Sequence, residues 1–404
     1  MYRTTNATAA GYRATMYELI GIVEKVDDDL DALRVAGTSP MQSELLTDVL
    51  VQTRMAENDL EKLPVGSEED KNAMNFLNRT SEACEMMLAK LNRGEKLSER
   101  DIKLIERLYE MNHQTRETLD ELAATVEDKD IMNWMKGVEN RITDALERIE
   151  NAVMPPEKKQ PPKTDGENGV MPLPSAKKKE REGIPSSQAE ELCKNYFADY
   201  NIESVVYAGE TLADGLKAYN FEMKNGEGTR LFAQISQADG ALIEFDFYQE
   251  CHEHIIDIET ARGLAESFLV KLGYENMIPV RVDEEDTNVD FKFVYSMDGC
   301  TYYPDSVTVK VCEERGVVVG LDASDFLKNH TQRGELQTKI TMEQAKNKLS
   351  DKLTVEASRL VLFEHDDREY TAYEFFCSYG GEFYFVYTDA MNGNELFIVN
   401  AKDD

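Results

Sequence analysis

Three glycine turns recur at nearly constant spacing in the second half of the chain, and they limit the possible folds more than any other pattern in it. Gly240, Gly316 and Gly393 lie 76 and 77 residues apart. Each stands between two short runs rich in β-branched and aromatic residues, and Val307, Val309 and Val311 alternate strictly with polar neighbours. Such alternation indicates a half-buried strand, and a glycine turn between two strands indicates a β-hairpin. The constant period predicts a repeated structural unit.

A helix start precedes each of these hairpins. A residue that can cap a helix is followed three positions later by a glutamate, glutamine or threonine, as in a capping box. The starts are Ser187–Glu190, Asp257–Thr260 and Thr341–Gln344. Two further strands separate each predicted helix from its hairpin, and one helix on one antiparallel sheet forms a small α+β unit. We therefore expect three tandem α+β repeats, at residues 186–256, 257–336 and 337–404.

Residues 1–153 are almost free of glycine and proline, and this region predicts helices. One apolar series advances in alternating steps of four and three residues, a heptad pattern typical of left-handed helix packing. It consists of Tyr12, Met16, Leu19, Val23, Val26, Leu30 and Leu33. We expect five helices with short connections, forming an antiparallel bundle or coiled coil that is also compatible with a homodimer through the first helix.

Two groups of polar residues lie in this helical region. Asp27, Asp28, Asp29 and Asp31 fall beside the apolar series, and we expect a solvated face there rather than a metal site. Asn112 and Thr115 lie on a later apolar series, where a polar layer can fix the register of a bundle at some cost in stability.

Residues 154–185 differ from both flanking regions. They hold seven of the eleven prolines and two lysine clusters. This composition predicts a disordered or polyproline-like linker that a protease cuts first.

The net charge and composition of the whole sequence restrict the classes of function. A net charge of −33 argues against a protein that binds nucleic acid or anionic membranes, because binding to either partner relies on clustered lysine and arginine side chains. No apolar run reaches the roughly 20 residues of a membrane span. The six cysteines form no C-x-x-C pair, so we expect neither a zinc site nor a disulfide framework, and Cys312 and Cys377 should be small buried residues. No cofactor-binding motif is present, so we expect no cofactor.

Two short motifs point to chemistry but have simpler interpretations. Gly380–Phe383 spells the active-site tetrapeptide of diguanylate cyclases, yet the upstream domain of that family is missing, and a turn between two strands is expected. His252 and His254 lie one residue apart beside Cys251, as in some metal sites. No third ligand can be named, so we favour an exposed connector and leave metal binding as the alternative.

Several segments resemble the YpeB family of spore-germination proteins, and the repeats resemble PepSY domains. The segments that carry the resemblance are Gly11–Leu19, Tyr303–Val311, Gly316–Ala323, Asn329–His330 with Arg333, Tyr373–Phe375, Phe385–Ala390 and Gly393–Glu395. They span nearly the whole chain. The resemblance implies a multidomain protein, with an N-terminal all-α bundle followed by PepSY-like repeats.

The resemblance also implies a function. Family members are non-catalytic proteins of spore-forming bacteria, partner the cortex-lytic hydrolase SleB, and accumulate in the dormant spore only together with it. They lie at the outer face of the inner spore membrane or in the cortex, and normally carry a membrane anchor before the helical region, which we do not find in this sequence.

Residues near the second hairpin are the candidates for partner binding. These are Tyr303, Asp305, Asn329, His330 and Arg333. The alternative for Asn329, His330 and Arg333 is helix capping and hydrogen bonding between repeats, and we expect Asp305 to be a turn residue rather than an acid catalyst.

Two hypotheses follow. In the first, the chain binds and stabilises a SleB-like hydrolase, and its repeats or its bundle hold the enzyme inactive until germination. Exposed sheet edges of the repeats are a candidate docking surface through β-augmentation. In the second, the chain is a scaffold that binds cortex peptidoglycan by stacking sugars on tyrosines, although most of these are expected in the core or in cross-strand pairs. The tyrosines are Tyr302, Tyr303, Tyr384 and Tyr387. We do not expect an enzyme.

Overall fold

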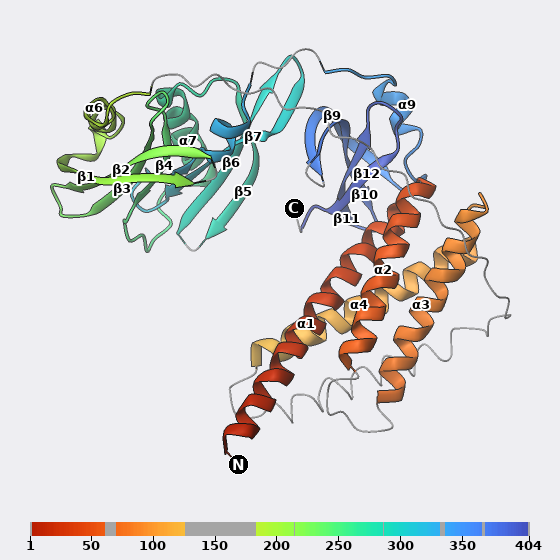
Figure 1. Ribbon diagram of the computed structural model, residues 1–404. Coiled ribbons are helices and arrows are strands. Elements are labelled where there is room, and N and C mark those ends of the chain that lie inside the picture. The colour runs from red at the N-terminus through yellow and green to blue at the C-terminus, as the bar shows by residue number, and fades with distance from the viewer. Residues whose placement is uncertain are drawn as a thin grey trace. The chain divides into compact units, whose positions relative to one another are not determined.

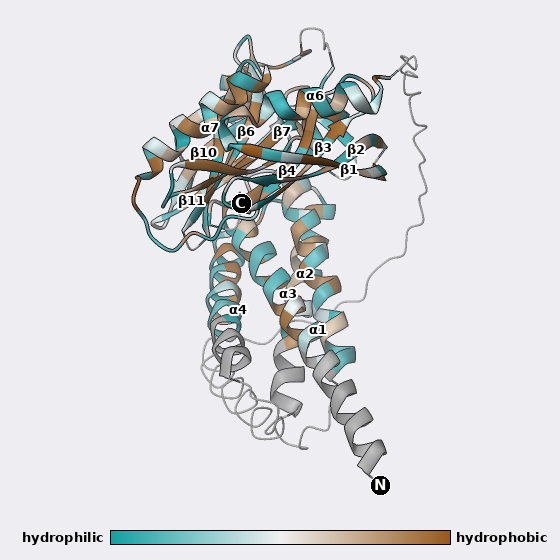
Figure 2. Ribbon diagram, turned by 90° about the vertical axis from the view of Figure 1, so that its left-hand side faces the viewer, coloured by the Kyte–Doolittle hydropathy of each residue, from teal (hydrophilic) through white to brown (hydrophobic). Residues whose placement is uncertain are grey.

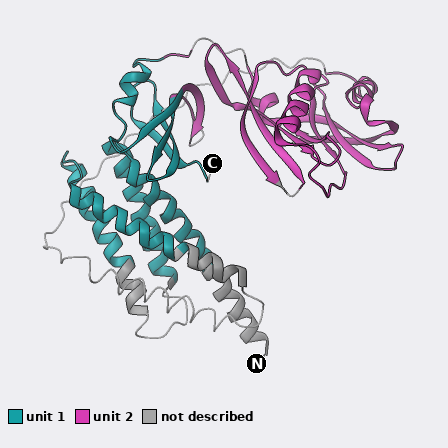
Figure 3. Cartoon of the chain, turned by 180° about the vertical axis from the view of Figure 1, so that it is seen from behind, with its two compact units in different colours: residues 1–165, 338–358, 373–404 teal, residues 166–337, 359–372 magenta. Residues whose placement is uncertain are grey.

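The computed structural model describes residues 2–60, 70–125, 183–213, 215–285, 287–331, 336–365 and 368–402. The chain divides into two compact units, coloured separately in Figure 3. Unit 1 contains residues 1–165, 338–358 and 373–404, and unit 2 contains residues 166–337 and 359–372. Unit 1 therefore joins the N-terminal helices to the C-terminal part of the chain.

Four helices of unit 1 lie within the described residues up to 125. They are α1 (Tyr2–Val35), α2 (Ser39–Leu60), α3 (Asp70–Asn92) and α4 (Glu99–Thr125). Helix α1 packs against α2 and α4, and α2 packs against α3 (Figure 1). Val26, Leu30 and Leu33 of the predicted apolar series are buried. The expected fifth helix lies outside the described residues.

Two of the three predicted helix starts, at Asp257 and Thr341, have the expected side-chain cap. Ser98 and Asp101 form reciprocal hydrogen bonds at the start of α4, because the backbone N–H of each donates to the side chain of the other. At the start of α2 the Gln42 side chain donates to the carbonyl of Ala36, so it satisfies a carbonyl that follows α1 and caps none of the first N–H groups of α2. The capping prediction at Ser187 is wrong, because α6 (Ser186–Tyr196) already begins one residue earlier, behind Pro185. The fixed φ of proline suits this helix start without a side-chain cap.

Unit 2 contains two helix–sheet segments that share one antiparallel sheet. After α6 and the short 3-10 helix η1 (Ala198–Tyr200) come β1 (Ile202–Ala213), β2 (Leu216–Asn225), β3 (Arg230–Ser236) and β4 (Leu242–Phe247). The second segment contains α7 (Ile258–Leu272), β5 (Met277–Glu285), β6 (Asn288–Met297), β7 (Cys300–Cys312), β8 (Val317–Asp322) and α8 (Ser324–Asn329). Strands β4 and β8 pair with each other, so the order β1-β2-β3-β4-β8-β7 runs through both segments.

The C-terminal segment repeats this order of elements. It contains α9 (Met342–Lys346), β9 (Thr354–His365), β10 (Arg368–Tyr379), β11 (Glu382–Asp389) and β12 (Glu395–Asn400). Thr341 and Gln344 form the predicted capping box. Gly380 and Gly381 adopt positive φ between β10 and β11, which confirms a turn where the cyclase-like tetrapeptide stands.

The three recurrent glycines occupy equivalent turns. Gly240, Gly316 and Gly393 all have positive φ, a region that only glycine enters without strain, and the N–H of each donates to the carbonyl four residues earlier. A Cβ on any of them would face an isoleucine that precedes the helix of the same segment. These isoleucines are Ile184, Ile256 and Ile340. The turn of each hairpin therefore packs beside the start of the first helix in the same segment.

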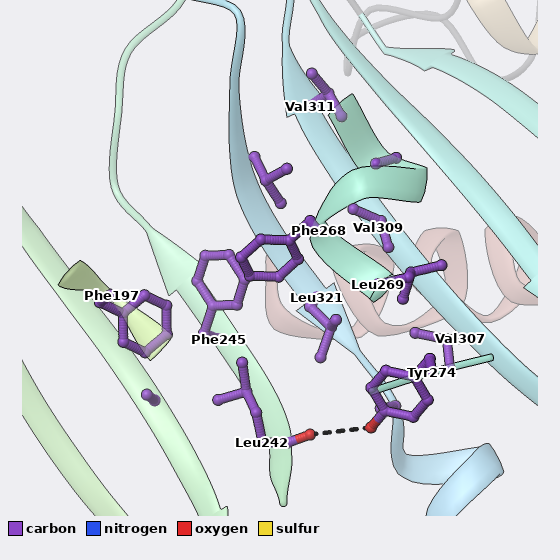
Figure 4. Packing of buried hydrophobic residues seen from close by; sticks show 14 of the residues in the cluster. Phe197, Leu242, Phe245, Phe268, Leu269, Tyr274, Val307, Val309, Val311 and Leu321 are labelled. Carbon is purple, nitrogen blue, oxygen red and sulfur yellow. Dashed lines mark hydrogen bonds between the residues drawn. The ribbon is translucent and has the colours of Figure 1, made fainter. Parts of the chain in front are cut away.

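The core of unit 2 is continuous across its two segments. Phe245 of β4 forms edge contacts with Phe197, which follows α6, and packs against Phe268 of α7, with ring centroids 5.0 and 5.5 Å apart (Figure 4). The valines of β7 predicted to face inward, Val307, Val309 and Val311, are fully buried. Figure 2 shows hydrophobic stretches along the strands and mixed hydropathy along α1 to α4.

Candidate functional site

Strand β7 and helix α8 bring four of the five predicted partner-binding residues together. Tyr303 and Asp305 lie on β7, Asn329 ends α8, and His330 follows it. Arg333 lies outside the described residues. We call Tyr303, Asp305, Asn329 and His330 the β7–α8 cluster.

A buried carboxylate anchors this cluster. The side chain of Asp305 is 0% exposed, and its Oδ2 lies 2.8 Å from Nδ1 of His330, whose side chain is 33% exposed. The imidazole stacks on Phe326 of α8 and meets the edge of Tyr295 of β6, with centroids 4.3 and 4.7 Å apart. Asp305 lies within a strand, so the expectation of a turn residue is wrong. The alternation along β7 turns its carboxylate inward, toward the end of α8.

Two more contacts fix the cluster at its ends. The side-chain amide of Asn329 donates to the carbonyl of Pro304 at 2.9 Å. Tyr303 Oη accepts from the guanidinium of Arg359 on β9 at 2.6 Å. The cluster thus holds α8 against the first half of β7. Its partly exposed imidazole and phenol are the groups that a protein partner could reach.

The Cys251–His254 motif belongs to an irregular connector, as expected, but its cysteine is not free. Cys251 and Cys312 form a disulfide between this connector and the end of β7. The expectations of no disulfide and of a free buried Cys312 are therefore wrong, because the fold places these residues with Cα atoms 6.2 Å apart. His254 pairs with Glu313. Within the described residues no group of three His, Cys, Asp or Glu side chains could hold a metal ion.

A charged cluster in unit 1 was missed by the sequence analysis. Asp27 and Asp31 of α1 are buried, so the expected solvated face is wrong at these two positions. Asp27 accepts hydrogen bonds from Asn112 and Arg116 of α4, and its Oδ2 lies 2.8 Å from His113 Nδ1. The buried Asn112 confirms the predicted polar layer.

Arg34 is the centre of a second group in unit 1. Its guanidinium donates to Asp31 at 2.6 Å, to Glu106 of α4 at 2.8 Å and to Glu382 of β11 at 3.2 Å. Burial alone would lower the pKa of Arg34, but its hydrogen bonds to Glu106 and Asp31 leave that pKa above the ordinary value. We call Asp31, Arg34, Glu106, Glu382 and Tyr384 the Arg34 cluster.

The pKa values of the carboxylates in the Arg34 cluster depend on their burial and on these hydrogen bonds. Burial raises the pKa of Asp31 despite its hydrogen bonds to Asn400, Tyr384 and Arg34.

The sequence does carry a signal for these charged groups, because Asp27, Asp31 and Arg34 follow one another at helical spacing along one stripe of α1.

The tyrosines proposed for sugar stacking are largely inaccessible. Tyr302, Tyr384 and Tyr387 are buried, and Tyr303 is half-buried and bonded to Arg359. This confirms that most of them lie in the core, and none of these four rings offers an open surface for stacking on a sugar.

Family models match almost the entire chain. "YpeB N-terminal" matches residues 2–136, "YpeB sporulation, PepSY1 and PepSY2 domains" matches residues 142–336, and "Peptidase propeptide and YPEB domain" matches residues 339–398. None of these models describes a catalytic family. No helix within the described residues is long and apolar enough to span a membrane.

Curated relatives agree with these matches. The sporulation protein YpeB of Halalkalibacterium halodurans is 25% identical over 95% of this chain and 88% of its own length. The YpeB proteins of Oceanobacillus iheyensis and Bacillus subtilis are 20% and 22% identical, over 96% and 97% of this chain and 88% and 90% of theirs. The solved Bacillus megaterium YpeB C-terminal domain is similar at 25% identity and a TM-score of 0.49, covering 55% of this chain and 99% of its own. The family models and the curated relatives together show that the chain belongs to the YpeB family of sporulation proteins.

Proposed function

We propose that this protein binds and stabilises a spore cortex-lytic hydrolase of the SleB kind and restrains it until germination. The observation that carries the proposal is the match of YpeB and PepSY family models along nearly the whole chain. PepSY regions are propeptide-like or regulatory rather than catalytic, which fits a protein that acts through another enzyme. The proposal includes a location in the spore, at the outer face of the inner membrane or in the cortex.

The proposal also includes three tandem PepSY-like repeats. Its support is the equivalence of the turns at Gly240, Gly316 and Gly393, which share positive φ, the same hydrogen bond and the same kind of isoleucine neighbour. A bundle that dimerises through α1 remains a prediction.

The docking surface that we favour is the open edge of β1. This strand is 12 residues long and pairs on one side with β2, and no other described strand pairs with it. Val206, Tyr207 and Leu212 are exposed along it. A long edge strand with apolar side chains can accept an extended segment of a partner through backbone hydrogen bonds. We expect the hydrolase to add such a segment to β1.

A binding titration tests this proposal on the full-length protein. The purified hydrolase is titrated with wild-type protein and with the Val206→Lys/Leu212→Lys variant, while its activity and thermal stability are followed. Lysines on an edge strand oppose pairing with another strand. The control is Val270→Lys, which changes an apolar side chain on α7 that is 71% exposed, compared with 68% for Leu212.

The possible results separate the parts of the proposal. Wild-type protein should raise the melting temperature of the hydrolase and lower its activity, and the β1 variant should do neither while the Val270 control behaves as wild type. Stabilisation without loss of activity would support a chaperone-like role and remove the restraint. Unchanged enzyme stability and activity with excess wild-type protein would contradict the proposed function.

A further inference from the structure

The N-terminal and C-terminal parts of unit 1 meet at the corner between α1 and α2. Helix α1 ends at Val35 and α2 begins at Ser39, so the corner consists of Ala36, Gly37 and Thr38 together with Arg34 in the last turn of α1. Both helices contact β12. The contact joins segments at opposite ends of the sequence, because all of unit 2 lies between them in the chain.

A carboxylate from β12 caps the start of α2. Glu395 is 5% exposed, and it accepts hydrogen bonds from the backbone N–H groups of Gly37 and Thr38 at 3.0 and 2.9 Å and from the Thr38 hydroxyl at 2.8 Å. The first N–H groups of a helix have no partner within the helix, and the positive end of the helix dipole favours a negative charge. Here the cap comes from the far end of the chain rather than from a neighbouring residue.

The backbone at this corner is in direct contact with the C-terminal segment. A Cβ on Gly37 would lie 2.4 Å from the backbone N of Ser350 and 2.7 Å from the carbonyl carbon of Leu349. Backbone atoms cannot yield as the end of a flexible side chain can, so the approach requires glycine. The shape of the corner is therefore matched to the loop that follows α9.

The Arg34 cluster forms the second half of the contact. Tyr384 Oη donates to Asp31 at 2.9 Å, and Asn400 Nδ2 donates to the same carboxylate at 3.0 Å. Lys352 Nζ donates to the carbonyl of Arg34 at 2.8 Å and to Glu106 at 3.1 Å. Charges of opposite sign are thus paired across the contact, and buried charges require such partners.

We propose that residues 338–358 and 373–404 form a binding module for the α1–α2 corner of the same chain. The corner supplies a helix start without a local side-chain cap, a glycine backbone and an arginine whose side chain is 11% exposed. The C-terminal segment supplies a carboxylate, a matching loop and hydrogen-bonding side chains. The contact holds the ends of the chain together without help from the covalent connection through unit 2.

Cutting the full-length protein tests the proposal. A recognition sequence for a site-specific protease is inserted between Asp165 and Gly166, and the folded protein is cut there. The cut protein should elute under native conditions as one particle with the mass of the uncut protein, and separate in urea into its two fragments. Separation of the wild-type fragments at micromolar concentration without denaturant would overturn the proposal.

Variants assign the association to this surface. Glu395→Ala and Arg34→Met should each raise the concentration at which the cut fragments separate by roughly tenfold or more. Glu395→Ala removes the acceptor of the Gly37 and Thr38 N–H groups, and Arg34→Met removes the charged donor that Asp31, Glu106 and Glu382 share. Exposed counterparts, Glu343→Ala on α9 and Arg93→Met after α3, serve as controls. Glu395→Gln keeps the shape of the side chain and should have an intermediate effect.

A folding control and two further outcomes complete the test of the proposed contact. Far-UV circular dichroism of the uncut variants shows whether their fold is intact. Cut variants that behave as the controls do would overturn the assignment to this surface. A cut particle with twice the mass of the uncut protein would show that the corner binds another copy, and would overturn binding within one chain.

Discussion

Breaking the disulfide between Cys251 and Cys312 is expected to reduce the free energy of unfolding of unit 2 by about 4 kcal/mol. The two cysteines are 61 residues apart in the sequence. A cross-link that closes a loop of this length lowers the conformational entropy of the unfolded chain, and the chain-entropy relation gives that figure at 25 °C. The loop encloses α7, β5, β6 and nearly all of β7.

The native contacts around the disulfide do not depend on the sulfur–sulfur bond. Thr287 Oγ1 donates to the carbonyl of Cys251 at 2.6 Å, and the N–H of Ile256 donates to the carbonyl of Glu313 at 3.1 Å. These bonds hold the connector beside β7 after reduction. We therefore expect the folded structure to remain and the loss to appear as easier global unfolding of this region.

Hydrogen exchange measured by mass spectrometry gives the assay. Amides of β6 and β7 that exchange only through global unfolding should exchange roughly a thousandfold faster after reduction, since each 1.4 kcal/mol corresponds to a factor of ten. Peptides from α2 serve as the internal control, because that helix belongs to unit 1. A Cys251→Ala/Cys312→Ala variant should exchange at the faster rate with or without reductant.

Two results would refute this reasoning. Six reactive thiols per chain in the unreduced, denatured protein would show that the disulfide is absent. A change in β7 exchange below about threefold, with the disulfide present before reduction, would show that the cross-link does not limit the unfolded chain as the entropy relation requires.

Three further predictions concern buried groups. Burial, with Asp48 and Asp28 nearby, raises the pKa of Asp29 to about 7, so its ionisation opposes folding increasingly as the pH rises from about 4 to 7. Asp29→Asn should therefore stabilise the bundle by about 1–3 kcal/mol at pH 8 and have little effect near pH 4 in urea unfolding curves; an equal effect at both pH values would contradict this. His330→Ala should cost about 1–3 kcal/mol because it removes a partner of the buried Asp305 carboxylate, and a double-mutant cycle with Asp305→Asn should give a coupling above 0.5 kcal/mol. Phe268→Ala should cost about 3–5 kcal/mol by leaving a cavity in the core of unit 2, and thermal unfolding that leaves its melting temperature unchanged would exclude that core.

The hairpins and most helix starts could be predicted because their causes are local. A positive φ at Gly316 depends on the turn around it, and the cap at Thr341 depends on a residue three positions away. Pairing between distant strands has no such signal. Neither the β4–β8 contact nor the parallel pairing of Cys300–Tyr302 with Leu360–Leu362 can be read from alternation, because alternation shows which face is buried but not which strand lies alongside.

The same contrast between local and distant causes explains which parts of the candidate sites could be predicted. Tyr303, Asp305, Asn329 and His330 were grouped by family resemblance, and the fold does bring them together. Asp31 was assigned to solvent because its partners, Tyr384 and Asn400, lie more than 350 positions away in the sequence. Arg34, three positions along the same helix, also donates to Asp31, but a pair at this spacing is equally common on an exposed helix face, and the other two donors come from another segment. The Cys251–Cys312 pairing was missed for the same reason. The domain boundaries remain predictions.

The corner contact changes how partner binding has to be measured. A fragment that starts near residue 186 would keep Glu395, Glu382 and Tyr384 but lose the Gly37 and Thr38 donors to Glu395, the Arg34 donor to Glu382 and the Asp31 acceptor of Tyr384. Glu395 would lose the hydrogen bonds from Gly37 and Thr38, which lower its pKa against the effect of burial in the full-length chain. The C-terminal segment would then be less stable for a reason unrelated to the hydrolase, and weak binding by such a fragment would not locate the docking surface. Substitutions on β1 in the full-length chain leave the corner intact, so a loss of binding there can be assigned to the edge strand.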